Sequence, residues 1–239
     1  MGGSERRTEY REEKPDRKSS ERRTGPQAAA TRTGGGLPRE PYHIFVPCAR
    51  YLEPITAGEL TELGLREVKE TKAGVACSGT HADLYRICLW SRTASRVLLL
   101  LAEGPAATEE ELYAAAASVD WDRHFSPERS FSVSASSSKS ALYNTSYMAL
   151  KIKDGIVDTF RSRSGRRPSV SSEQPDIRIY GRIERDRLKL YLDASGEALH
   201  KRGYRLEKTE APLRETAAAA MLLKAGWPEI AADGGVFLD

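Results

Sequence analysis

The chain has 239 residues, of which 39% are hydrophobic and 30% are charged, and its formal net charge is +3. This content favours one or two domains with a buried core, and no apolar run approaches the ~20 residues that a membrane-spanning helix needs. The three cysteines are odd in number and lack CxxC spacing. They therefore indicate reduced thiols in a cytoplasmic protein rather than a disulfide framework or a zinc site.

The first forty residues are rich in Arg, Glu, Ser and Gly and nearly free of aliphatic side chains. They contain no apolar h-region, so we expect no secretory signal. Such a segment cannot bury enough apolar surface to offset the entropy of ordering it. We therefore predict a disordered tail over residues 1–40, which can be removed without unfolding the rest of the chain.

Residues 41–103 carry six consecutive strand and helix signals. Periodicity and turn residues predict strand, helix, strand, strand, helix and strand at His43–Cys48, Leu52–Leu63, Arg66–Thr71, Val75–Ser78, Asp83–Trp90 and Arg96–Glu103. This β-α-β-β-α-β order is that of a ferredoxin-like subdomain. Trp90 is expected in the core or at a domain interface.

A second unit is predicted over residues 104–205. Thr108 and Glu111 form a capping box before an Ala-rich helix that ends near Ser118. A half-buried strand, a long helix and an antiparallel pair of strands follow at Ser130–Ser136, Asn144–Ser162, Asp176–Gly181 and Leu188–Asp193. The remaining residues, 206–239, predict a linker helix within Ala211–Leu223 and a strand at Val236–Leu238. The fold class is therefore α/β of the α+β type.

Charge is distributed unevenly along the chain. The net charge is +3 over residues 1–40, −4 over 41–138, +7 over 139–205 and −3 over 206–239. A basic stretch between two acidic ones fits a binding face for a polyanion. The alternative is that these charges only solvate helices and edge strands.

The serine-rich stretch before the long helix is the first candidate anion site. Asn144 or Thr145 can cap this helix, whose first turn presents unpaired backbone N–H groups and a positive dipole end. Lys139 lies just before it, and Lys151 and Lys153 lie on its solvent side. Residue types alone fit an ordinary amphipathic helix equally well. In this helix Gly155 is expected to cost up to ~1 kcal/mol relative to Ala.

Two further basic clusters flank the last predicted strands. Arg161, Arg163, Arg166 and Arg167 surround Gly165 after the long helix. Four arginines exceed what a helix C-terminus requires and predict bidentate phosphate contacts.

In the second cluster, His200, Lys201, Arg202 and Arg205 surround Gly203, and Tyr204 can stack on an unpaired base or lie beneath the turn. His200 is expected to be structural. The predicted RNA-binding residues are Lys139, Asn144, Lys151, Lys153, Arg161, Arg163, Arg166, Arg167, Arg202, Tyr204 and Arg205.

Three motifs resemble the bacterial THUMP-containing methyltransferases that modify guanine N2 in the 23S ribosomal RNA of the large subunit. They are the N-x-S-Y and K-x-K-D-x-I-V-D run of Asn144–Asp158, the L-W-S-R-x-A-S-R passage ending at Arg96, and the R-G-Y-R turn with the later A-P-L-R-E-T segment. The resemblance covers nearly all of residues 42–239. It implies a ferredoxin-like subdomain, then a THUMP domain with family-style boundaries near 84 and 195, then the start of a methyltransferase domain.

The resemblance also implies what this chain lacks. In the family a D-P-x-C-G-S-G loop binds S-adenosylmethionine, and Asp239 matches only its first residue. No catalytic, cofactor-binding or metal-binding residue can therefore be assigned. S-adenosylmethionine is expected only for the full-length enzyme, and the isolated chain is not expected to methylate RNA. The implied partner is ribosomal RNA of the large subunit, and we expect no DNA partner, no membrane and a cytoplasmic monomer. Two alternatives remain, a THUMP module of a tRNA-modifying enzyme and a free-standing RNA-binding or interaction adaptor.

Overall fold

The computed structural model describes residues 41–203 and 212–238. Within these ranges one sheet has the strand order β2-β3-β1-β4-β7-β6-β5. Its neighbouring strands are antiparallel except for β5 and β6, which are parallel. The predicted fold class, a mixed α/β protein with a ferredoxin-like unit first, is confirmed.

The first unit contains the six predicted elements in the predicted order. They are β1 (Tyr42–Pro47), α1 (Glu53–Glu62), β2 (Arg66–Thr71), β3 (Gly74–Gly79), α2 (His81–Trp90) and β4 (Leu98–Pro105). The central strand β1 lies between β3 and β4, as the split βαβ arrangement requires. Leu60 of α1 and Ile87 of α2 are fully buried against Val46 and Val75 on one face of these strands.

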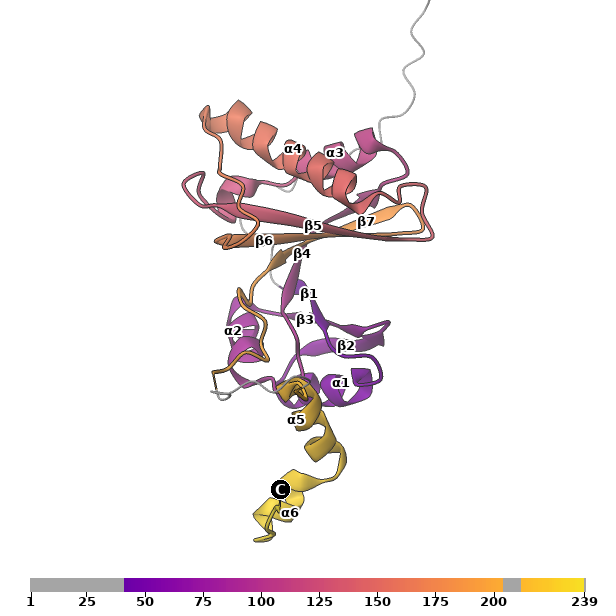
Figure 1. Ribbon diagram of the computed structural model, residues 1–239, viewed down its shortest axis with the longest axis vertical. Helices are drawn as coiled ribbons and strands as arrows, with labels where there is room; N and C mark the ends of the chain where they lie inside the picture. Colours follow the sequence, from indigo (N-terminus) through magenta and orange to yellow (C-terminus); the bar gives the residue numbers. More distant parts are fainter. Residues whose placement is uncertain (1–40, 204–211, 239) are drawn as a thin grey trace, which may run out of the picture. The chain divides into compact units, whose positions relative to one another are not determined.

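The second unit consists of α3 (Glu109–Ala117), a short 3-10 turn (Trp121–Arg123), β5 (Phe131–Ser138), α4 (Thr145–Ser164), β6 (Ile177–Glu184) and β7 (Arg187–Asp193). Helix α4 connects the parallel strands β5 and β6, which need such a crossover. Helices α3 and α4 lie together over this part of the sheet (Figure 1). Trp121, Phe131 and Phe160 belong to the hydrophobic core that these helices form with the sheet.

Strand β4 belongs to both units, because it pairs with β1 through Leu98 and Leu99 and with β7 along its whole length. Leu101 of β4 and Leu192 of β7 each pack against both hydrophobic cores. A side chain points to one face of its sheet, so both cores and their helices lie on the same face. No described helix covers the opposite face of these strands, which we call the helix-free face and which carries the alternate side chains.

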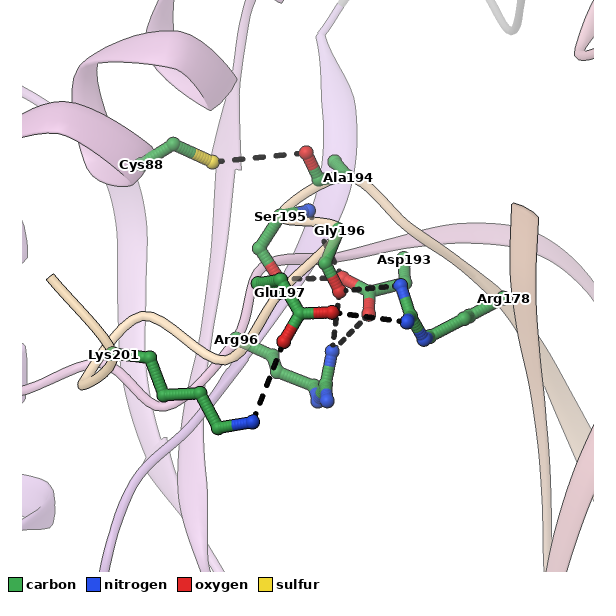
Figure 2. A network of polar contacts seen from close by, with 9 residues as sticks. All are labelled: Cys88, Arg96, Arg178, Asp193, Ala194, Ser195, Gly196, Glu197 and Lys201. Atoms are coloured by element: carbon green, nitrogen blue, oxygen red, sulfur yellow. Dashed lines mark hydrogen bonds and ion pairs between the residues drawn. The ribbon is translucent and has the colours of Figure 1, made fainter. Parts of the chain in front are cut away.

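A polar network fastens residues 194–197 to the ends of β4, β6 and β7 (Figure 2). Arg96 Nη1 lies 2.5 Å from Oδ2 of Asp193 and donates to the carbonyl oxygen of Gly196 at 2.9 Å. The same carbonyl accepts from Arg178 Nη1 at 2.9 Å. The Asp193 side chain is fully buried, and Arg96 supplies its charge partner. Both arginines therefore serve the structure of this junction.

Two sequence predictions differ from the structure. Trp90 is 68% exposed rather than buried. Trp90 is three residues after the buried Ile87, so helical spacing alone does not account for its exposure; it is the last residue of α2. No strand forms at residues 236–238, since a strand needs a hydrogen-bonded neighbour and no described strand pairs with them.

The C-terminal region holds the predicted linker helix and one helix that was not predicted. The linker helix is α5 (Glu215–Lys224), and a short helix, α6 (Trp227–Ala232), follows it. Tyr204 and Arg205 lie outside the described residues. In the described part of the chain, none of the helices has the length and apolar content that a membrane crossing requires.

Candidate nucleic-acid-binding surface

The N-terminus of α4 has the predicted cap. Asn144 Oδ1 accepts a hydrogen bond from the backbone N–H of Tyr147 at 3.1 Å. Lys139 is exposed in the turn after β5 and has a positive φ of 51°. This turn contacts the β6–β7 turn, where the N–H of Arg185 donates to the carbonyl of Ser138 at 3.2 Å. Lys139 is therefore placed beside Arg185.

The surface where α4 meets α3 beside Lys151 is acidic rather than basic. Lys151 Nζ lies 3.3 Å from Oε2 of Glu109, which also accepts from the Tyr147 hydroxyl at 2.6 Å. These hydrogen bonds to Tyr147 and Glu109 raise the pKa of Lys151. Lys153 pairs with Asp154 at 2.6 Å. The hollow beside Lys151, of about 330 Å³, is lined by the carboxylates of Glu109, Glu110, Asp154 and Asp158. Such a surface repels phosphates.

The arginine cluster after α4 is largely neutralised by carboxylates that the fold brings to it. The ion pairs are Arg161 with Asp158, Arg163 with Asp120 and Asp122, and Arg166 with Glu128. The hydrogen bond from Arg163 lowers the pKa of Asp120. Among the described residues, Arg167 is the member of the cluster without a carboxylate partner. The cluster carries four positive charges opposite four negative ones.

Arg202 binds backbone oxygen atoms at the end of α2. Its Nη2 donates to the carbonyl of Ser91 at 3.0 Å and its Nη1 to that of Leu89 at 3.4 Å. These contacts hold the segment after β7 against the ferredoxin-like unit. Arg202 therefore has a structural role in this turn.

The structure does not bring the described members of the predicted set together at one place. Helix α4 has 20 residues and is therefore about 30 Å long at 1.5 Å per residue. Lys139 and Asn144 lie at its N-terminal end, and the arginine cluster lies at its C-terminal end. Arg202 lies against a different helix, α2.

A hollow of about 550 Å³ opens on the helix-free face, where β1, β3 and β4 meet β6 and β7. Five basic and two acidic residues line it: Lys72, Arg182, Arg185, Arg187, Lys189, Glu103 and Glu184. Sequence reasoning did not single out these basic residues. The alternation in Arg178-Ile-Tyr-Gly-Arg182 and in Arg187-Leu-Lys189 was the available signal, since period-two alternation places such side chains on one face of a sheet.

The described residues offer no metal site, because no three His, Cys, Asp or Glu side chains among them form a group that could hold an ion. Residues 234–238 also do not form the strand end and glycine turn with which α/β folds hold nucleotide cofactors.

Comparison with known proteins identifies both units. Residues 43–98 match the family described as the RlmL ferredoxin-like domain, and residues 106–193 match the THUMP domain.

The chain is 46% identical over 199 residues to the ribosomal RNA large subunit methyltransferase K/L of Syntrophotalea carbinolica, covering 83% of this chain and 28% of that protein. It is 48% identical over 196 residues to the protein of the same name from Methylococcus capsulatus, covering 82% and 27%. The chain thus spans about a quarter of the length of these curated relatives.

A solved structure shares the fold. SMU.472, which is named as a methyltransferase and was crystallised complexed with SAH, is 29% identical with a TM-score of 0.69. The similarity covers 78% of this chain and 49% of that one.

Proposed function

We propose, from the premise that the chain belongs to the RlmL ferredoxin-like and THUMP domain families, that it is the RNA-binding part of a ribosomal RNA methyltransferase. The carrying observation is that both domains match in this order in a chain 46–48% identical to ribosomal RNA large subunit methyltransferases K/L. Such a module holds large-subunit ribosomal RNA so that a guanine N2 reaches a catalytic domain. Ribosomal RNA lies in the cytoplasm, where we expect the module to act.

S-adenosylmethionine is the methyl donor that we propose for the longer enzyme. The residues described here do not fit it, because Gly234 and Gly235 follow α6 and lead into no strand. A methyl-transfer step is therefore not assigned to this chain. Its own contribution is to bind and orient RNA.

The test is binding of the purified 239-residue chain to fluorescently labelled fragments of large-subunit ribosomal RNA, measured by anisotropy across a salt series. Phosphate contacts release counterions, so affinity should fall linearly with the logarithm of salt concentration. We expect tighter binding to ribosomal RNA than to tRNA or to a DNA duplex of equal length. Tighter binding to tRNA would favour a tRNA-modifying enzyme, and binding to RNA no tighter than to duplex DNA would refute the proposal.

A further inference from the structure

The hollow on the helix-free face has more positive than negative charges, whereas the charges of the arginine cluster balance. Its lining carries five cations and two carboxylates. Arg187 and Lys189 share Glu103, at 3.5 and 3.9 Å, and Arg182 lies 3.2 Å from Glu184.

Two lining cations have no carboxylate partner among the described residues. They are Lys72 in the β2–β3 turn and Arg185 in the β6–β7 turn, and both are exposed. Their exposure leaves them available to a ligand. Lys139 adds a further exposed cation beside Arg185.

The strand register places two other cations of the hollow, Arg182 and Lys189, directly opposite each other. Arg182 of β6 pairs with Lys189 of β7, and the side chains of both strands alternate so that both point to the helix-free face. Like charges at directly opposite positions destabilise a sheet. Glu184 lies 3.2 Å from Arg182 and Glu103 lies 3.9 Å from Lys189, so carboxylates already offset part of this repulsion, and the pair adds to the positive charge of the hollow without being free.

Aromatic rings lie beside these cations. His43 is exposed and Phe45 half-buried on β1, and the Phe45 and Tyr191 ring centroids are 5.9 Å apart. Burial raises the pKa of Tyr191 to about 12. Cations beside rings that are at least partly exposed, as those of His43 and Phe45 are, form the combination by which proteins hold single-stranded nucleic acid.

We propose that this hollow binds an unpaired segment of RNA, with backbone phosphates on Lys72 and Arg185 and a base against His43 and Phe45. The inference rests on the proposed function and names the site and the form of the RNA. A volume of about 550 Å³ lies within the usual range for small-molecule sites, which is the scale of single nucleotides. Double-stranded RNA is instead recognised by contacts spread across successive grooves. The hollow therefore selects unpaired nucleotides.

The experiment compares two double variants of the full chain with equal loss of charge. Lys72→Gln/Arg185→Gln removes the unpaired cations of the hollow, and Arg163→Gln/Arg166→Gln removes paired cations of the arginine cluster. Affinity is measured by anisotropy for an unpaired ribosomal RNA segment and for the same segment annealed to its complement. Thermal unfolding of each variant confirms that it folds.

We expect the hollow variant to lose about tenfold in affinity for the unpaired segment, on the order of 1.4 kcal/mol. Its salt slope should decrease by about 1.4, which is 0.7 for each of two phosphates. The cluster variant should change both quantities much less. His43→Ala should weaken binding without changing the salt slope, because stacking releases no counterions.

Several outcomes would overturn the inference. Equal losses in the two double variants, an unchanged hollow variant, or equal affinity for the paired and unpaired segments would each reject the hollow as the site while leaving the proposed function standing. Failure of the wild-type chain to bind RNA better than duplex DNA would reject the proposed function, and the inference with it.

Discussion

Glu59 offers a sharp test of how the ferredoxin-like unit is held together. Its side chain is 3% exposed, and its carboxylate accepts five hydrogen bonds from the turn after α2. Oε2 accepts from the hydroxyls of Ser91 and Thr93, each at 2.7 Å, and from the N–H of Thr93 at 3.2 Å. Oε1 accepts from the N–H and Nε of Arg92 at 2.9 and 3.0 Å.

Replacing Glu59 with Gln keeps the shape of the side chain, but it removes the negative charge and turns one of the two acceptor oxygens into an NH₂ donor. The two hydroxyls can rotate to accept from the new NH₂, but the backbone N–H groups cannot. Whichever oxygen is replaced, at least one buried donor faces another donor. Losing one partner of a buried charged contact costs about 3 kcal/mol. For a protein of this size the melting temperature should fall by about 6–12 °C.

The effect should depend on pH. Burial alone would raise the pKa of Glu59, but the hydrogen bonds from Ser91, Arg92 and Thr93 outweigh it and hold the pKa below its usual 4.5. A carboxylate whose pKa is lower in the folded state stabilises the protein at any pH above its pKa in the unfolded chain. This contribution to stability is lost as the pH falls through the pKa of the folded state. The difference between wild type and Glu59→Gln should therefore be largest near neutral pH and shrink below about 4.5.

Calorimetry across a pH series measures this difference. Glu62→Gln is the matched control, because Glu62 is exposed on the same helix and should change stability by no more than about 0.5 kcal/mol. Equal melting temperatures for wild type and Glu59→Gln at pH 7, or a difference that stays constant into the acid range, would refute the reasoning.

Three further predictions follow from buried contacts. Gly155→Ala should lower the urea midpoint of unfolding by an amount equivalent to about 1–3 kcal/mol, because a Cβ there would lie 2.9 Å from Cβ of Ala116. A higher urea midpoint for the variant would contradict this prediction. Asp193→Ala should cost about 3 kcal/mol in the same assay, since it leaves Arg96 without its buried partner. Cys77, whose pKa burial raises to about 12, should resist a thiol reagent at pH 8 until the protein is unfolded, and rapid labelling of the native protein would show otherwise.

Local signals were sufficient for most elements of the fold. The capping box at Thr108 and Glu111 forms as predicted, with the N–H of Glu111 donating to Oγ1 of Thr108 at 3.2 Å. Such signals act within four residues, so the sequence contains them completely. Helix α6 was missed because it has six residues and starts with Trp-Pro, too short for a helical period to be recognised.

Gly155 shows where local reasoning reaches its limit. Helix propensity alone predicts that Gly weakens α4 by up to about 1 kcal/mol relative to Ala. In the structure Gly155 lies against Ala116 and the carbonyl of Tyr113 in α3, and it lets the two helices approach closely. This gain depends on a residue 39 positions away, which propensity does not include.

The basic residues show the same limit for the candidate site. Along the chain the four arginines between 161 and 167 form the densest positive cluster, yet the carboxylates opposite them come from positions up to 43 residues earlier. Conversely, Arg182 and Lys189 are interspersed with apolar residues in the sequence and become neighbours through the β6–β7 register. A phosphate responds to the charge that remains after pairing. The tertiary partners of each cation therefore decide which surface can bind RNA, and they favour the hollow on the helix-free face.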